Sequence, residues 1–173
     1  TKMKRTALIT ASVLALSLSS QAIAGAGHGD GTSIGMPGSA ENVDRVIDVS
    51  MDEMKFEPNG ISVKEGETIK FVVSNDGNII HEFNLGTPEM WKGHKGEMIK
   101  MLKTGMMTMK KVNHEKMMEA GMMHDDANSV LLEPGQTAEV IWTFSETTEM
   151  GFACNVPGHR EAGMVAAVKF QGH

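Results

Sequence analysis

The chain of 173 residues has no tyrosine, only one cysteine and no apolar run long enough to span a bilayer comfortably. A lone cysteine cannot form an internal disulfide, so Cys154 is an inert buried thiol, a link to another chain or a metal thiolate. Acidic residues outnumber basic ones by 22 to 16, and the formal net charge is −6. Because nucleic acid selects basic surfaces, we expect no nucleic-acid partner.

Residues 1–24 have the pattern of a secretory signal peptide. The basic pair Lys4-Arg5 precedes an apolar run over 7–20, and the small-x-small triplet Ala22-Ile23-Ala24 follows it. We therefore expect cleavage near residue 24, a periplasmic location and no membrane span after cleavage. An N-terminal anchor that is kept is the alternative. Residues 25–42 are rich in small residues without periodicity, which predicts a flexible N-terminal tail.

The rest of the chain, residues 43–173, is predicted to form one all-β domain. Its β-branched and alternating segments are short, and turn residues separate them every eight to twelve positions. This pattern favours an antiparallel β-sandwich of seven or so strands. An insertion of different composition interrupts the pattern at about 87–128. The expected strands cover 43–51, 68–74, 79–85, 129–132, 137–144, 149–154 and 164–170.

The C-terminal part of the chain holds a Cys-x4-His-x4-Met skeleton made by Cys154, His159 and Met164. A turn at Pro157-Gly158 reverses the chain, so one short loop brings a thiolate, an imidazole and a thioether together. A second imidazole must come from elsewhere, and His81, which follows a strand break, is the candidate. Taken singly, each residue has an ordinary interpretation as a core or surface side chain, and only their conjunction predicts a metal site.

Two histidines, one cysteine and a weak axial methionine are the ligand set of a type 1 copper site. Thiolate and thioether suit Cu(I), while imidazole also suits Cu(II). Zinc accepts histidine and cysteine but rarely a thioether, so the methionine favours copper. The sequence therefore predicts one type 1 copper ion, blue or green, that changes between Cu(II) and Cu(I).

The segment from Gly151 to Met164 resembles the copper loop of the cupredoxins, the family of plastocyanin, azurin and pseudoazurin. Residues 75–83 resemble the segment that carries their first histidine. The resemblance covers roughly 43–85 and 129–170, and it implies a Greek-key β-sandwich with copper near one end. It implies as ligands His81, Cys154, His159 and Met164. The residue after the first histidine is commonly asparagine in the electron carriers and is Glu82 here, so we expect altered surroundings of the copper.

The insertion concentrates methionine, with ten of the chain's sixteen between residues 90 and 123. Met98, Met101 and Leu102 have the spacing of an ordinary apolar helix face, and a second helix is predicted over about 108–120. Adjacent pairs such as Met106-Met107 point to different faces, so packing does not require both. Clustered thioethers with interspersed histidine suit Cu(I) or Ag(I). The candidate secondary ligands are Met106, Met107, Met109, His114, Met117, Met118, Met122, Met123 and His124.

A sandwich with such an insertion resembles the periplasmic copper-resistance cupredoxins of the CopI type. This resemblance implies copper tolerance, by sequestering copper or handing it on to an efflux pump, an oxidase or a redox protein. The alternatives are a soluble electron-transfer cupredoxin and a metallochaperone whose methionine segment is the functional site. The remaining histidines show no His-x-His pairs, which disfavours a multicopper oxidase. We expect a monomer that is not an enzyme.

Overall fold

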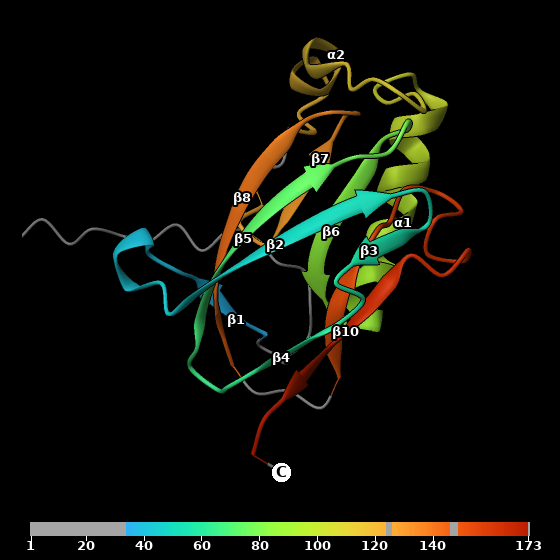
Figure 1. Cartoon of the computed structure of the whole chain (residues 1–173). Coiled ribbons are helices and arrows are strands. Elements are labelled where there is room, and N and C mark those ends of the chain that lie inside the picture. Colours follow the sequence, from blue (N-terminus) through green and yellow to red (C-terminus); the bar gives the residue numbers. More distant parts are fainter. Residues whose placement is uncertain (1–33, 124–125, 146–148, 173) are drawn as a thin grey trace, which may run out of the picture.

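The computed structural model describes residues 34–123, 126–145 and 149–172. Over these residues, ten strands form two five-stranded sheets that enclose a common core (Figure 1). This confirms the predicted β-sandwich. Three short strands, β1, β3 and β4, add to the seven that the alternation pattern predicted, because three-residue strands are too short to show a period of two.

The first sheet has the strand order β1-β8-β5-β2-β3. Strands β2 and β5 run parallel with a register of seven residue pairs, and the other neighbours in this sheet are antiparallel. Its strands are β1 (Gly35–Pro37), β2 (Arg45–Asp52), β3 (Lys55–Glu57), β5 (Thr68–Asn75) and β8 (Thr137–Phe144).

The second sheet has the order β4-β10-β9-β6-β7, and only the β4 and β10 pair is parallel. Strand β10 alternates exposed and buried side chains, whereas every residue of β6 and β9 is buried. The inner strands β6 and β9 are therefore covered on both faces, whereas one face of β10 meets solvent. The strands are β4 (Ile61–Val63), β6 (His81–Gly86), β7 (Ser129–Leu132), β9 (Met150–Ala153) and β10 (Val165–Phe170).

Phenylalanine rings fill the space between the sheets. Phe83 of β6 and Phe152 of β9 have ring centroids 5.1 Å apart. Phe56 of β3 packs edge-on against Phe152 at 5.0 Å, and Phe71 of β5 lies 5.1 Å from Phe83. Aromatic pairs at such separations add to the free energy of burial. The core therefore reaches both strands that lead into the predicted metal site.

The insertion between β6 and β7 carries both α-helices of the described residues, α1 (Pro88–Lys103) and α2 (His114–Glu119). Helix α1 begins after Thr87, whose hydroxyl accepts from the Met90 N–H, and Pro88 occupies the first turn. Figure 1 shows α1 beside the second sheet and α2 at the end of the molecule. No helix in the described residues combines the length and apolar character needed to cross a membrane.

The expected helix over about 108–120 is wrong in its first half. Met107 and Val112 form an isolated antiparallel bridge, so the chain between them is a tight turn. The Thr108 hydroxyl accepts from the backbone N–H of Lys111 within that turn. Helix α2 begins only at His114, where the Asn113 side chain caps the first turn. Local side-chain hydrogen bonds of this kind compete with helix formation.

Part of the expected N-terminal tail belongs to the fold instead. Strand β1 pairs with β8, and a 3-10 turn, η1 (Ala40–Asn42), follows it. The indole of Trp142 donates a hydrogen bond to the Ile34 carbonyl at 3.1 Å. Gly35 has φ of +126°, and a Cβ there would lie 2.0 Å from the Thr143 carbonyl oxygen. Glycine therefore allows close backbone approach here. Residues 1–33, with the predicted signal segment, lie outside the described residues.

Candidate metal centre

The predicted ligands meet at one end of the second sheet. His81 is the first residue of β6, Cys154 directly follows β9, and Met164 directly precedes β10. Strand β9 is antiparallel to both β6 and β10, with Ala153 opposite Asn84 and Val165. Because antiparallel neighbours place the end of one strand beside the start of the next, the sheet brings these positions together.

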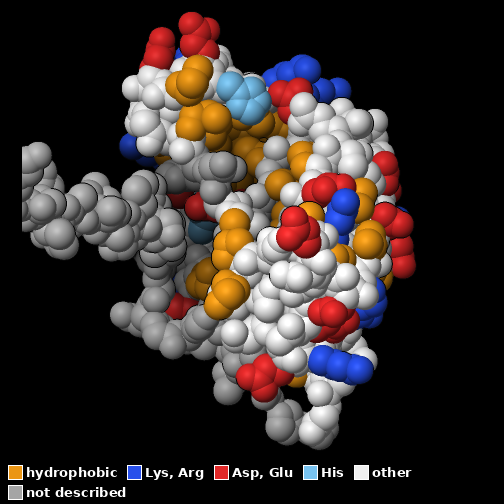
Figure 2. Space-filling view, turned by 90° about the vertical axis from the view of Figure 1, so that its left-hand side faces the viewer, with side chains coloured by type: hydrophobic (Ala, Val, Ile, Leu, Met, Phe, Trp, Pro, Cys, Tyr) orange, Lys and Arg blue, Asp and Glu red, His pale blue; other side chains and the backbone are white. Residues whose placement is uncertain are grey.

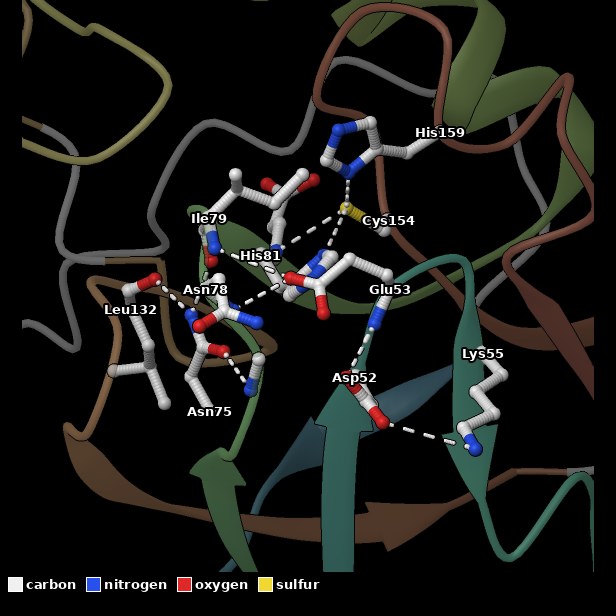
Figure 3. A network of polar contacts seen from close by, with 12 residues as sticks. Asp52, Glu53, Lys55, Asn75, Asn78, Ile79, His81, Leu132, Cys154 and His159 are labelled. Carbon is white, nitrogen blue, oxygen red and sulfur yellow. Dashed lines mark hydrogen bonds and ion pairs between the residues drawn. The ribbon is translucent and has the colours of Figure 1, made fainter.

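Three side chains converge on a small buried volume (Figure 3). The Nδ1 atom of His159 lies 3.3 Å from the sulfur of Cys154, and Nδ1 of His81 lies 4.0 Å from it. The three ligand atoms are all within 4.8 Å of one another. Cys154 and His81 are completely buried, and His159 is 2% exposed. The predicted convergence of His81 with the C-terminal loop is therefore present in the fold.

The loop from Cys154 to Met164 is closed by backbone hydrogen bonds. The Cys154 N–H donates to the Met164 carbonyl at 3.1 Å, and the Met164 N–H donates to the His159 carbonyl at 3.0 Å. Gly158 and Gly163 have φ of +91° and +101°, a conformation that glycine adopts without strain. Met164 is completely buried. The loop thus places a thioether residue beside the cysteine and histidine that precede it.

Burial controls the protonation of these groups. It raises the pKa of the Cys154 thiol to about 12, so the thiolate needs a nearby cation at neutral pH. Burial also lowers the pKa of His159 to about 4, helped by the neighbouring His81, and lowers that of His81. Both imidazoles are therefore neutral at pH 7 and have a lone pair available for a metal.

The donor set fits a copper ion. The buried Cys154 sulfur faces Nδ1 of His159 and of His81, and the three ligand atoms lie within 4.8 Å of one another, close enough for one metal ion to contact all three. Thiolate, imidazole and thioether together are soft and borderline donors, which suit copper in both oxidation states. Magnesium and calcium prefer oxygen donors, which this group lacks.

Two residues that the motif did not reveal also lie at this site. The Glu53 carboxylate is 3.7 Å from Nε2 of His81. It accepts backbone N–H groups from Asn78 and Ile79, and the Asn78 bond lowers the pKa of Glu53 to about 2. His94 of α1 reaches the buried Glu82 carboxylate at 3.1 Å. Both are distant from His81 in sequence, so only the fold places them here.

The candidate secondary ligands separate into two groups. The buried methionines belong to the apolar core, whereas exposed ones lie on the surface of the insertion. Figure 2 shows apolar side chains gathered at the end of the molecule that carries α2, beside a histidine. His114 is exposed, and His124 lies outside the described residues. The buried group is Met106, Met107, Met117 and Met122; the exposed group is Met109, Met118 and Met123, with exposed fractions of 43, 65 and 49%.

The sandwich and its donor set define the class of copper proteins that share the cupredoxin fold. Comparison with family models agrees, because the model for "Copper binding proteins, plastocyanin/azurin family" matches residues 43–171. The chain belongs to this family, and its cofactor is copper.

Curated relatives narrow the assignment within the family. The chain is 43% identical over 175 residues to the "Copper-resistant cuproprotein CopI" of Pseudomonas aeruginosa, covering 95% of this chain and 97% of the relative. It is 38% identical to the protein of the same name from Rubrivivax gelatinosus, covering 82 and 75% of the two chains. This chain is therefore a cupredoxin of the CopI type.

Solved structures support the fold. Auracyanin B superimposes with a TM-score of 0.57 at 15% identity, covering 80% of this chain and 96% of that one. Auracyanin A of Chloroflexus aurantiacus gives a TM-score of 0.51 at 17% identity, covering 73 and 98%. At such low identity, these likenesses extend to the fold alone.

Proposed function

We propose that one copper ion binds His81, Cys154, His159 and Met164 as a type 1 site, and that the protein acts in copper tolerance. The observation that carries this proposal is the buried group of two imidazoles and one cysteine, with ligand atoms within 4.8 Å. Similarity to proteins named for copper resistance supports the second part. The protein is exported to the periplasm, where it sequesters copper or hands it on.

The first test concerns the copper–thiolate bond. A type 1 site gives an intense visible band, because the sulfur donates electron density to Cu(II). Cys154→Ser keeps a similar volume but removes the thiolate, so the band is expected to disappear. Absorption spectra of the Cu(II)-loaded proteins check this. A band that survives in Cys154→Ser would show that the sulfur is not a ligand.

Extra Cu(I) binding would separate copper handling from simple electron transfer. We propose that the exposed Met109, Met118 and Met123 bind this additional Cu(I), because the buried methionines are already occupied in packing. Thioethers on the surface remain free to meet a soft monovalent ion. A sequestering protein is therefore expected to bind more than one copper per chain when a reductant is present.

Copper stoichiometry with reductant tests this proposal. Replacing Met109, Met118 and Met123 together by leucine is expected to reduce binding to one equivalent, with the type 1 band unchanged. Met36→Leu is the matched control, because Met36 is 61% exposed but lies on β1, outside the insertion. One equivalent at most in the unaltered protein would instead support the alternative, an electron-transfer cupredoxin.

That alternative has one structural observation in its favour. All four proposed ligands are at most 2% exposed and lie at the end of a closely packed sandwich. A rigid, buried site limits rearrangement between Cu(II) and Cu(I), which suits rapid electron exchange. In this case the insertion would be a surface for docking a redox partner.

A further inference from the structure

A buried carboxylate lies between the proposed copper loop and helix α1. Glu82 is only 3% exposed, and a buried charge is costly unless partners satisfy it. One of its oxygens accepts hydrogen bonds from the backbone N–H and the side-chain amide of Asn155, at 3.0 and 2.9 Å. The other faces His94 at 3.1 Å and the Asn84 amide at 3.3 Å. Glu82 thus connects the residue after Cys154 to the insertion.

The partner from the insertion is positively charged. His94 lies between two carboxylates, with Nε2 toward Glu82 and Nδ1 3.1 Å from Glu97. The hydrogen bond to Glu82 is the main reason that the pKa of His94 rises to about 9. At neutral pH both ring nitrogens therefore donate. The pair of Glu82 and His94 is close to neutral overall, so burying it costs less free energy than burying a single charge.

One face of α1 holds the helix against the same loop. Trp91, His94 and Lys95 are spaced so that they lie on one side of a helix. The guanidinium of Arg160 is 6.0 Å from the Trp91 ring, and Lys95 forms an ion pair with Glu161. Because Arg160 and Glu161 belong to the loop between Cys154 and Met164, the helix contacts this loop at several points.

We propose that Glu82 and His94 form a positioning pair through which the insertion holds the Cys154 segment and sets the electrostatic surroundings of the copper site. The backbone N–H of Glu82 also donates to the Cys154 sulfur at 3.3 Å. A displaced Glu82 would therefore change a hydrogen bond to the sulfur as well as the position of Asn155. This inference rests on the proposed copper site, because the pair acts through the copper ligands.

The test is the reduction potential of the copper-loaded full chain. His94→Gln leaves the Glu82 charge unbalanced near the copper, and a nearby negative charge favours Cu(II) over Cu(I). We expect the Cu(II)/Cu(I) ratio at fixed potential to rise on the order of tenfold, given the low dielectric of the interior. A tenfold change equals about 59 mV for a one-electron couple. The thiolate band is expected to shift as well.

Three variants make the result specific. Lys92→Gln removes a positive charge two residues before His94 on α1. Lys92 is exposed and lies outside the face formed by Trp91, His94 and Lys95, so this matched control is expected to change the ratio less than about threefold, since exposed charges are screened. His94→Lys keeps a positive charge beside Glu82 and is expected to restore the potential. Adding Glu82→Gln to His94→Gln removes both charges and should return the ratio toward its original value.

A second measurement uses the copper-free protein. If the pair holds Asn155, His94→Gln is expected to accelerate hydrogen exchange at the Asn155 amide, whereas Lys92→Gln leaves it unchanged. If potential, band and exchange all remain unchanged in His94→Gln, the positioning role is wrong although the copper site stands. If the band persists in Cys154→Ser, the copper assignment itself fails. If His94→Gln does not fold, the comparison of His94→Lys with His94→Asn decides, since only the variant with a positive charge at position 94 should preserve the potential.

Discussion

Single residues at the metal centre both fill core volume and offer a donor atom for copper. A substitution can remove one of these roles and keep the other. Met164 is completely buried, so it fills core volume whether or not its sulfur meets copper. Cys154 and His159 are likewise buried. A side chain of similar volume but different chemistry therefore distinguishes a ligand from a packing residue.

Met164→Leu is the substitution that makes this distinction for the thioether. Leucine has nearly the same volume, so the free energy of unfolding of the copper-free protein is expected to fall by less than about 1.5 kcal/mol. If Met164 holds the copper, loss of its thioether sulfur would shift the Cu(II) spectrum and raise the reduction potential. Spectra and redox titration check the ligand role, and denaturant unfolding checks the packing role. An unchanged spectrum and potential would mean that Met164 is only a core residue.

His94 gives the copper-free protein a pH-dependent stability. Its pKa is raised from 6.5 to about 9, so the folded state holds this proton more tightly than the unfolded chain. The stabilisation is complete below about pH 6.5 and is lost as the pH rises through about 9. Allowing for screening of a partly exposed ring, the loss should be about 1–2 kcal/mol.

Denaturant unfolding between pH 6.5 and 9 checks this prediction. Contributions from other groups are common to both proteins, so the difference between the unaltered chain and His94→Gln isolates the histidine. The two stability curves are expected to converge toward pH 9. Parallel curves over this range would contradict a charged His94 in the folded protein.

At the scale of the elements, the sequence predicted most strands but misplaced the helix boundary in the insertion. Alternation over 137–144 agrees with β8, and the strand expected over 149–154 contains β9, which ends one residue before Cys154. The helix expected from about 108 fails because the Met107–Val112 bridge and the Thr108 hydroxyl form a competing turn. These contacts depend on local geometry that hydrophobic spacing does not encode.

Strand β9 depends on a glycine where it passes β10. A Cβ at Gly151 would lie 2.2 Å from the Ala166 carbonyl oxygen and 3.4 Å from the Trp91 ring. Gly151→Ala is therefore expected to separate the strands and lower the free energy of unfolding by about 1–3 kcal/mol. Because Cys154 directly follows β9, the copper band is also expected to weaken.

Gly96→Ala is the control for this substitution. Gly96 lies within α1 with no atom near its Cβ position, so alanine should stabilise the protein by up to about 1 kcal/mol. Denaturant unfolding of both variants gives the comparison. If Gly151→Ala has the same free energy of unfolding as Gly96→Ala, then β9 and β10 tolerate the extra methyl group.

At the scale of the whole molecule, the sequence revealed the sandwich and the loop that carries Cys154, His159 and Met164. The juxtaposition of His81 agrees with the family resemblance, while the contacts of Glu53 and His94 could not be foreseen. A local motif is readable because one short loop contains it. The contacts of residues on distant strands and in the insertion form only when the complete fold packs. The spacing of residues along the chain therefore does not reveal them.

The folded structure divides the methionines of the insertion into buried core residues and exposed surface residues. Six that lie in the insertion are core residues, including Met98 and Met101 of α1. Most methionines of the insertion therefore pack in the core, as the helix-like spacing of Met98 and Met101 indicated. The exposed Met109, Met118 and Met123 have no such role, which is why the proposed binding of soft metal concentrates on them.

Protection from oxidation tests this division across the entire chain. Peroxide converts exposed methionine to sulfoxide, so Met36, Met109, Met118 and Met123 are expected to oxidise well before the buried Met107. Silver, as a redox-inert substitute for Cu(I), occupies the thioether sulfur where it binds. Ag(I) is therefore expected to slow the oxidation of the three exposed residues of the insertion severalfold, measured by peptide mass spectrometry, while Met36 oxidises at its original rate. Equal oxidation of all four with and without silver would exclude the insertion surface as a soft-metal site, because exposure alone would then explain every rate.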